Sequence, residues 1–485
     1  MVRVVSVLNL LGVLLIIFAL AMAVPLAVSL YYGDAAGHAY DEAVLITLAS
    51  GIVLRGATRR KRQELRPRDG FLLVALVWTV VPAYATLPLM IFLPDLSFTD
   101  AYFETVSGLT TSGATVLSGL DKLPPSINFW RAFLIWIGGM GVVVLAVAIL
   151  PLLGVGGSQI FKAETPGPMK DTKLTPRITE TAKGLWAVYA IITLACIGAM
   201  KAAGMSWFDA VVHAFATMGL GGFSSHDASF AFFDSPAIEA VTIVFMLIAG
   251  INFGTHFLAF RRHSLRPYRA DPEVGAYLSV LIVSCLGIAY FLLANHVYPD
   301  YRTALRYAAF NVVSIATTTG FANTDFALWP VFAPVWMLFL SCFSTCSGST
   351  GGGIKMVRAE LMVRQALREL MRIVHPRAYL PVKLGGQMVE NNIVFAVLAF
   401  MLVYGGTMVT MTMLLAASGL DIITAFSAVV ACINNMGPGL GQVGPSTTYA
   451  ALNDFQTWVC SATMLLGRLE LFSMLVVFTP AFWRR

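Results

Sequence analysis

Long apolar runs alternate along the chain with short polar segments. One run covers Val4–Leu30, and others cover Phe71–Leu93 and Phe129–Leu153. Each is long enough to cross a bilayer, because a membrane-spanning helix needs ~20 predominantly apolar residues. The first run is too long for the apolar region of an ordinary signal peptide and lacks a clean small-residue cleavage site, so we expect a retained helix. The pattern predicts an all-α polytopic membrane protein.

A shorter pattern recurs four times between these spans, where an alanine precedes a glycine by twelve residues. The pairs are Ala101 and Gly113, Ala210 and Gly222, Ala308 and Gly320, and Ala425 and Gly437. About ten to twelve residues are too few to span a bilayer but suit a re-entrant helix. Non-helical backbone at membrane depth is tolerated only where it is buried or lines a water-filled cavity. We therefore expect four copies of span, re-entrant helix, glycine loop and span around one axis.

This repeat divides the chain into five parts. Residues 1–70 hold two extra transmembrane helices, and the four pore repeats follow at residues 71–180, 181–270, 271–385 and 386–485. The predicted fold is therefore four span–pore-loop–span repeats around a pseudo-fourfold pore, plus two N-terminal helices.

Positive charge is concentrated between the repeats. The net charge is +6, and 26 of the 32 Lys and Arg residues lie at the chain ends and in four linkers. The linkers are Arg55–Arg68, Lys162–Lys183, Arg261–Arg269 and Lys355–Lys383. Because cytoplasmic loops collect Lys and Arg, we expect the linkers and both termini to face the cytoplasm. The same rule explains the stretch RRKRQELRPR better than nucleic-acid binding does, and no nucleic-acid partner is expected.

Composition supports the membrane assignment and gives little support to other classes. The 485 residues are 58% apolar and 12% charged, whereas soluble domains are about 45–50% apolar and about 25% charged. The six cysteines form no CxxC pair, so neither a disulfide framework nor a zinc site is indicated. The histidines form no HExxH pattern, and we expect neither an enzyme nor a bound cofactor.

The loops that end the short helices read TTSG, GLGG, TTTG and NNMG. Moving a unit ion from water into a low-dielectric medium costs on the order of 20 kcal/mol, so a pore must replace the hydration shell with oxygen atoms, as rings of backbone carbonyls do. Glycine reaches the unusual dihedral angles this requires at least cost, and hydroxyl side chains can add an oxygen or tie the loop to its helix. Uncharged oxygens favour a monovalent cation, because a divalent site would bring carboxylates.

The fourfold plan, one glycine per loop, the two N-terminal helices and the motif NNMGPGLG resemble the Trk/Ktr/HKT superfamily of cation transporters, above all the membrane subunits of bacterial Trk potassium uptake systems. The resemblance covers essentially the whole chain and implies selectivity for K⁺ over Na⁺, with Rb⁺ also accepted. The ion-binding filter residues that it implies are Thr110, Thr111, Ser112, Gly113, Gly219, Leu220, Gly221, Gly222, Thr317, Thr318, Thr319, Gly320, Asn434, Asn435, Met436 and Gly437. None of the loops is the TVGYG of tetrameric potassium channels, which suggests fewer well-formed ion sites.

The resemblance also implies a location and partners. We expect a multi-pass protein of the bacterial inner membrane that forms a homodimer and works with a separate cytoplasmic nucleotide-binding regulatory subunit. The basic stretches Arg55–Arg68 and Arg358–Arg377 could dock that subunit, and they would also attract the headgroups of anionic membrane lipids.

The segment CSGSTGGGIKMVR interrupts the second span of the third repeat. Its serines and glycines should break the helix, and it is not a phosphate-binding loop, because Lys355 lies between Ile354 and Met356 instead of in the Gly-Lys-Ser/Thr order of a Walker A motif. One interpretation, which the resemblance also implies, is an intramembrane gate below the filter with a hinge at Gly351, Gly352 and Gly353. The other is a kink that allows close packing.

Two charged residues lie within predicted membrane elements. Arg468 is in the last apolar span, where a charge is costly and usually faces a partner or water. It could form a barrier to cations below the filter, where the family also has a basic residue, or pair with a carboxylate on another helix. Glu470 is a poor partner, because two residues are roughly 200° around a helix. Glu104 could attract cations at the pore mouth or be a solvated helix charge.

Two other functions compete with a channel-like potassium transporter. A symporter that couples cations to protons or sodium by alternating access would need acids near the midplane, and no Asp or Glu pair lies deep in two matching helices. An intramembrane enzyme would need a nucleophile with a base, or a metal cluster, and the apolar segments supply neither.

Overall fold

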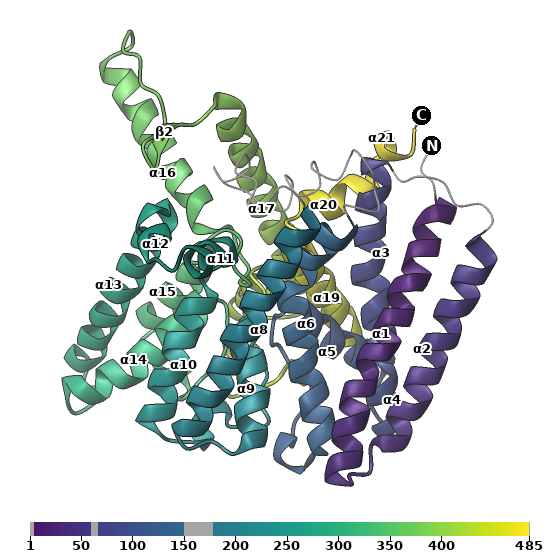
Figure 1. Ribbon diagram of the computed structural model, residues 1–485. Coiled ribbons are helices and arrows are strands. Elements are labelled where there is room, and N and C mark those ends of the chain that lie inside the picture. Colours follow the sequence, from purple (N-terminus) through teal and green to yellow (C-terminus); the bar gives the residue numbers. More distant parts are fainter. Residues whose placement is uncertain (1–3, 60–65, 150–177, 485) are drawn as a thin grey trace.

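The computed structural model describes residues 4–59, 66–149 and 178–484 (Figure 1). Residues 60–65 of the linker Arg55–Arg68 and most of the linker Lys162–Lys183 lie outside the described residues. Helices α1 (Val4–Tyr32) and α2 (Gly37–Thr58) form an antiparallel hairpin at one side of the molecule. A Cβ atom added at Gly12 would lie 2.9 Å from the carbonyl oxygen of Gly51, so the two glycines allow the closest approach of this hairpin.

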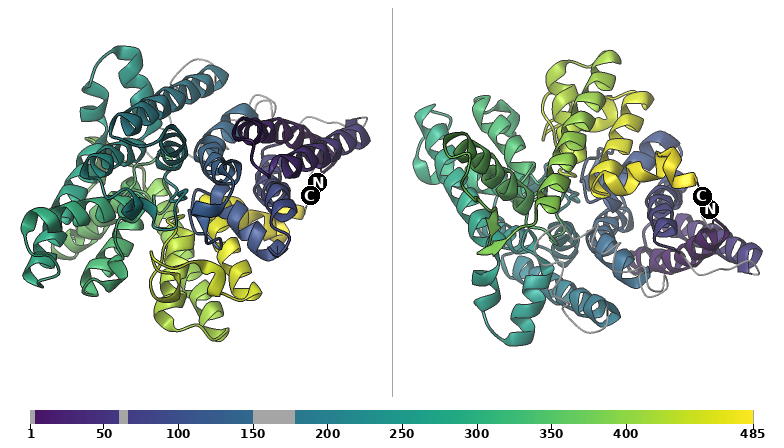
Figure 2. Two further views of the ribbon diagram at one scale, coloured as in Figure 1. Left: turned by 90° about the horizontal axis from the view of Figure 1, so that it is seen from below. Right: turned by 90° about the horizontal axis from the view of Figure 1, so that it is seen from above.

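The four repeats share one plan, in which a short helix lies between two spans. The first spans are α3 (Pro67–Ala85) with α4 (Leu87–Phe92), α8 (Ile178–Ala202), α13 (Pro272–Ala294) and α17 (Asn391–Ala417). The short helices are α5 (Phe98–Leu109), α9 (Trp207–Gly219), α14 (Tyr301–Ala316) and α18 (Ile422–Ile433). The second spans are α6 (Pro125–Ile149), α10 (Pro236–Ala249) with α11 (Phe253–Arg262), α15 (Phe332–Ser341) with α16 (Met356–Val374), and α19 (Asp454–Arg468) with α20 (Phe472–Leu475). Viewed from either end in Figure 2, the repeats follow one another in chain order around a common centre.

Among the described residues, five helices are long and apolar enough to cross a membrane, or up to seven if bent pairs count as single spans. The two bent pairs are α10 with α11, which turn by 93°, and α19 with α20, which turn by 107°. The sequence predicted an interrupted second span only in the third repeat. The second and fourth repeats break as well, and Asn252 stabilises the new start of α11 by accepting a hydrogen bond from the Gly254 N–H.

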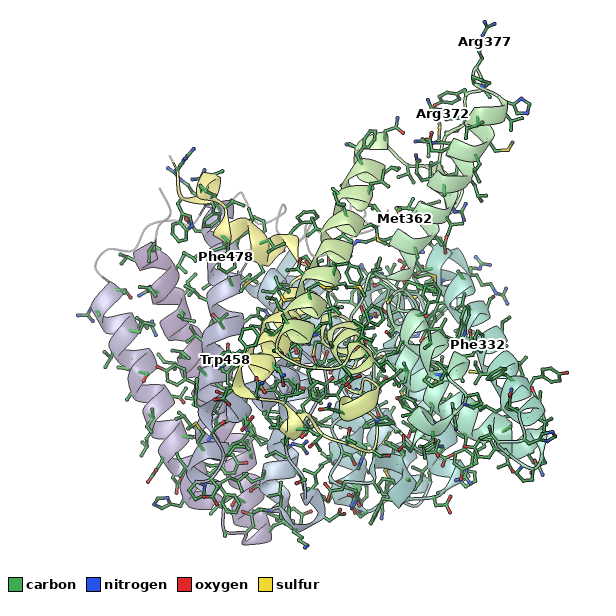
Figure 3. All side chains as sticks on the ribbon, turned by 180° about the vertical axis from the view of Figure 1, so that it is seen from behind. Phe332, Met362, Arg372, Arg377, Trp458 and Phe478 are labelled. Carbon is green, nitrogen blue, oxygen red and sulfur yellow. The ribbon has the colours of Figure 1, made fainter. Side chains whose placement is uncertain are left out.

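The chain beyond the break in the third repeat forms an arm. Helix α16, the two-residue strands β1 (Lys383–Leu384) and β2 (Gln387–Met388), and the start of α17 project beyond the rest of the molecule. Figure 3 shows Arg372 and Arg377 towards the end of this arm. The small elements α12 (Arg266–Ala270) and α21 (Pro480–Trp483) complete the described helices on the same side.

The recurring alanines position the short helices. Ala101, Ala210, Ala308 and Ala425 are all fully buried. A small side chain at this place lets each short helix pack closely between its two spans, which explains why the same residue type recurs at the same distance from the glycine. The alanine–glycine spacing therefore reports packing at one end of the short helix and a turn at the other.

Candidate functional site

All four short helices begin with a side-chain cap. Ser97, Ser206, Asp300 and Asp421 each accept a hydrogen bond from the backbone N–H three residues later. Asp100 and Asp209 lie in the first turns of α5 and α9, where their negative charge interacts favourably with the positive end of the helix dipole. The opposite ends, which carry the partial negative charge, all lead directly into the glycine loops. This arrangement favours cations at the loops.

The four helices also end in the same way. In the first loop the Ser112 N–H donates to the Ser107 carbonyl (2.8 Å) and the Thr111 N–H donates to the Gly108 carbonyl (3.0 Å), which is the Schellman arrangement. The other three loops have the equivalent N–H to carbonyl bonds. They run from Gly221 to Ala216 and from Leu220 to Thr217 in the second loop, from Thr319 to Ser314 and from Thr318 to Ile315 in the third, and from Met436 to Ala431 and from Asn435 to Cys432 in the fourth. Four bond pairs in register give the four loops a common backbone shape up to the residue before the ring glycine, where Gly113, Gly320 and Gly437 have positive φ and Gly222 does not.

This ending places a non-glycine residue in the left-handed region four times. The φ angles are 58° at Thr111, 53° at Leu220, 62° at Thr318 and 53° at Asn435. Such residues cost roughly 1–2 kcal/mol each and persist where the surrounding structure holds them, often at functional sites. Sequence reasoning missed this feature, because the helix-ending glycine that normally signals it is absent.

The glycines lie two residues further on and form a closed ring. A Cβ atom added at Gly113 would contact the backbone nitrogen of Gly222, and one at Gly222 would lie 2.7 Å from the Gly320 carbonyl carbon. One at Gly320 would contact the Met436 carbonyl oxygen, and one at Gly437 would lie 2.8 Å from the Ser112 carbonyl oxygen. Each loop therefore touches the next, and the fourth touches the first.

Hydroxyl and amide side chains fix the loops. The Thr110 hydroxyl donates to the Val106 carbonyl at 2.7 Å and contacts the Ser112 hydroxyl at 2.9 Å. Thr317 makes the same two contacts in the third loop, with the Val313 carbonyl and the Thr319 hydroxyl. The Asn435 amide donates to the Ser112 hydroxyl at 3.0 Å and so joins the fourth loop to the first. Of the two roles that the sequence allowed for the hydroxyls, the structure shows that of tying a loop to its helix.

A cavity of about 220 Å³ opens on one side of the ring, and all four ring glycines line it. The Tyr449 hydroxyl donates to the Gly437 carbonyl oxygen at 2.8 Å. A protein hydroxyl therefore already binds the Gly437 carbonyl oxygen, and in this respect the fourth loop departs from the symmetry of the ring.

At the rim of this cavity, His226 bridges two carboxylates. Its Nδ1 contacts Asp121, and its Nε2 lies 3.2 Å from the Asp209 carboxylate. The ring stacks on Phe232, with centroids 3.5 Å apart, and faces His213 on the other side at 6.3 Å. Although burial disfavours the charged form, the hydrogen bonds to both carboxylates raise the pKa of His226 above its ordinary 6.5.

The Glu104 carboxylate neither faces the pore mouth nor lies in solvent, so both interpretations drawn from the sequence are wrong. Its side chain and that of Arg131 on α6 are each about 1% exposed and form an ion pair at 2.7 Å. Glu104 also accepts from the Val116 N–H just beyond the first loop, and Arg131 donates to the Ser224 carbonyl beyond the second. The pair thus joins two neighbouring loops. The sequence signal for this ion pair was Arg131, a basic residue within the apolar run that forms α6.

The segment that joins α15 to α16, residues 342–355, lies against the other side of the ring. We call it the intramembrane loop. The Thr350 hydroxyl donates to the Met218 carbonyl at 2.9 Å, and the Gly352 N–H donates to the Thr318 hydroxyl at 3.0 Å. A Cβ atom added at Gly351 would lie 3.1 Å from the Thr317 carbonyl oxygen, and one at Gly352 would contact the Asn434 carbonyl oxygen. Two of the predicted hinge glycines, Gly351 and Gly352, therefore lie directly against the third and fourth glycine loops, whereas Gly353 faces the backbone of Cys342.

Two cationic side chains hold this loop. Arg468 donates to the Thr350 carbonyl at 2.8 Å and to the Gly138 carbonyl on α6 at 2.7 Å, and Lys355 donates to the Gly351 carbonyl. Glu470 pairs with Arg358 at 2.5 Å, so it is a partner of another arginine. Arg468 therefore lies below the ring, as one sequence interpretation required, and links repeats one, three and four.

A buried carboxylate that sequence reasoning missed ties the middle of the loop to the first turn of α16. Glu273, in the first turn of α13, accepts from the Ser347 N–H at 2.8 Å and from the Val357 N–H at 3.2 Å. No group of three or more His, Cys, Asp or Glu residues that could hold a metal ion occurs within residues 4–59, 66–149 and 178–484.

Comparisons with known proteins give a consistent result. The family model TrkH, described as a cation transport protein, matches residues 38–485. The Trk system potassium uptake protein TrkH of Vibrio parahaemolyticus is 47% identical over 482 residues, which are 99% of each chain. TrkG of Escherichia coli is 36% identical over 474 residues, covering 98% of this chain and 97% of its own. The crystal structure of the potassium transporter TrkH from Vibrio parahaemolyticus superposes with a TM-score of 0.90 at 45% identity, covering 99% of this chain and 100% of that one.

Proposed function

Because the chain belongs to the TrkH family of cation transport proteins, we propose that it conducts K⁺ into the cell through a pore whose selectivity filter is the ring of four glycine loops. Rb⁺ should follow the same path. The TrkH and TrkG relatives are named potassium uptake proteins, and the chain has a ring glycine at all four equivalent positions.

The closed ring is the observation that supports this function. Four backbone segments with a common shape up to the ring glycine meet there, and four helix ends with partial negative charge point at it. Backbone oxygens at such a place can replace the water shell of a monovalent cation. The four loops carry no charged side chain, which suits K⁺ better than a divalent ion.

The intramembrane loop acts as the gate. It lies across the inner side of the ring, where Lys355 and Arg468 add two positive charges to the path of a cation. Conduction requires the loop to leave the ring and break its bonds to Met218, Thr318 and Arg468. Its glycines at 351, 352 and 353 give it the backbone freedom to do so.

The side of the ring that carries the cavity faces outward, and the basic linkers, the arm and both termini face the cytoplasm of a bacterial cell. This orientation follows from the concentration of Lys and Arg in the linkers. The arm, with its basic helix α16, then presents itself to a separate nucleotide-binding regulatory subunit and to anionic lipid headgroups. A homodimer is the expected assembly.

A symporter that works by alternating access is the second candidate. The broken second spans of the second, third and fourth repeats are a feature that such carriers share. A carrier would couple uptake to a proton or sodium gradient, whereas a channel-like pore follows the gradient of the conducted ion alone.

Uptake of radioactive Rb⁺ into proteoliposomes, with K⁺ or Na⁺ as competitor, tests the proposal. We expect K⁺ to compete and Na⁺ to compete much less, with no requirement for a proton or sodium gradient. Uptake that needs such a gradient would support the carrier, and equal competition by Na⁺ would contradict the assigned filter.

A further inference from the structure

An apolar crevice lies between the third and fourth repeats, away from the ring. Its volume is about 430 Å³, which is within the usual range of ligand sites, ~300–1,000 Å³. Helix α15, marked by Phe332 in Figure 3, forms one wall and α18 the other. The lining residues that matter here are Val335, Phe339, Cys342, Phe426, Ser427 and Val430.

The mouth of the crevice opens to the surroundings of the membrane body. Val335 is 50% exposed, Phe339 53% and Phe426 47%. Beside them, Ile422 and Ile423 continue the same apolar surface. A surface of this kind on a membrane-spanning protein faces lipid hydrocarbon.

The interior of the crevice offers nothing to water. The Ser427 hydroxyl already accepts from the Leu440 N–H at 2.8 Å, and the Cys342 thiol contacts the Leu338 carbonyl and the Asn434 amide. Because a water molecule needs two to four polar partners, an apolar cavity of this kind stays dry. It also lacks the polar rim and hydrogen bonds of an ordinary protein interface.

We propose that this crevice binds one acyl chain of a membrane lipid. A flexible hydrocarbon chain can enter from the bilayer through the mouth at Val335 and run towards Cys342 at the floor. Burying its methylene groups against the aromatic walls is favourable, and no polar group is left without a partner.

The floor of the crevice belongs to the gate. Cys342 is the residue at which α15 ends, and its carbonyl accepts from the Ile354 N–H at 2.6 Å. A Cβ atom added at Gly353 would lie 2.7 Å from the same carbonyl, and the Asn434 amide contacts the Cys342 thiol at 3.4 Å. An acyl chain against Cys342 therefore braces the loop in the position seen here, across the ring, and lowers uptake. This coupling rests on the proposed function, whereas the binding of the chain does not.

Photolabelling of the full-length protein in proteoliposomes tests the site. The probe is a phosphatidylethanolamine with a diazirine at the end of one acyl chain, and labelled residues are mapped by mass spectrometry. We expect the label on crevice residues to exceed that on Ile282 and Val283, which are exposed on α13. Equal labelling would overturn the proposal. So would crevice residues that are labelled only after dimers dissociate, because a second copy would then fill the crevice.

The variant Val335→Trp narrows the mouth. Val335 and Cys342 are seven residues apart, about 10 Å along a helix, so an indole there blocks the chain without reaching the floor. Losing one buried methylene of contact corresponds to about fourfold weaker occupancy, and the label should fall at least that much. Val331→Trp, on the same face one turn earlier and outside the crevice, is the matched control and should leave the label unchanged. Unchanged labelling in Val335→Trp would overturn the site.

The same two variants test the coupling. Rb⁺ uptake should rise in Val335→Trp and stay unchanged in Val331→Trp. Lost labelling with unchanged uptake would overturn the bracing of the gate. Absence of Rb⁺ uptake by the unaltered protein would contradict the proposed function alone, because the labelling result does not depend on transport.

Discussion

Replacing Gly113 with serine should weaken discrimination between K⁺ and Na⁺. The residue has φ 77°, and a Cβ atom there would contact the Gly222 backbone nitrogen and lie 2.8 Å from its Cα. Ordinary contact begins at 3.4 Å, and the Gly222 nitrogen lies closer to the added atom than the Cα does, so the Gly222 backbone must move by more than about 0.6 Å, the difference 3.4 − 2.8. Backbone atoms in a closed ring cannot turn aside as a flexible side chain can, and the neighbouring loops must shift too.

The left-handed φ alone costs roughly 1–2 kcal/mol for a non-glycine residue, and a control can separate this strain from the displacement of the ring. Gly119 has φ 72° with nothing within 4 Å of an added Cβ. Gly119→Ser therefore carries the same backbone strain without touching the ring. Gly119→Ser should lose thermal stability through this strain alone and Gly113→Ser should lose more, and only Gly113→Ser should change ion selection.

The assay is radioactive Rb⁺ uptake into proteoliposomes in competition with K⁺ or Na⁺. We expect the ratio of the two competitor affinities to fall about tenfold in Gly113→Ser, which corresponds to ~1.4 kcal/mol of lost discrimination. Gly119→Ser should keep the original ratio. An unaltered ratio in folded Gly113→Ser, or the same loss in both variants, would refute the assignment of this ring as the filter.

Three further changes probe the gate, the buried pair and the rim. Arg468→Gln removes a positive charge and a clamp on the intramembrane loop, so basal Rb⁺ uptake should rise, and an unchanged rate in folded protein would speak against the gate. Glu104→Gln leaves Arg131 buried without its charge partner and should lower the free energy of unfolding by about 3–5 kcal/mol, measured by denaturant titration; a neutral effect would show that the pair is dispensable. Hydrogen bonds to two aspartates raise the pKa of His226 in the folded protein. The stability that protonated His226 adds to the fold is therefore fully present below pH ~6.5 and is lost as the pH rises through the raised pKa. The midpoint of thermal unfolding should therefore fall as the pH rises above about 6.5, and His226→Asn should remove that part of the pH dependence.

The sequence predicted the fold well because its signal is periodic and local. The spacing from Ala101 to Gly113 recurs because one residue must be small for packing and the other must allow the loops to meet. Apolar runs reveal spans for an equally simple reason, since lipid tolerates little else. The family and its transport class are confirmed, and with them the expectation that the chain is not an enzyme. The assignment of individual filter and gate residues remains a prediction.

The missed features depend on contacts between distant parts of the chain. Glu104 and Arg131 lie in one repeat, but Arg131 also holds Ser224 in the next, and no spacing rule connects those loops. In the sequence, Glu273 is an ordinary acidic residue in the first turn of a helix. Only the structure shows that the intramembrane loop donates a hydrogen bond to its carboxylate. The left-handed residue in the first three loops was hidden for a different reason, because threonine and leucine seldom adopt that conformation. Asn435 in the fourth loop is of a type that adopts it more readily, and it was the available signal.

The site combines a symmetric backbone with asymmetric support, and the proposed gate requires this combination. All four loops share the same pair of backbone hydrogen bonds, which would give an ion four similar neighbours. The support beneath them differs, however, because within the described residues it is the third repeat that places a loop against the ring. Thr318 meets that loop through its hydroxyl, whereas Asn434 is held by Ser341 and Tyr404. Four identical subunits could not place one loop and one arginine across a shared axis. A single chain can, because each repeat is free to change its side chains while its backbone keeps the common shape.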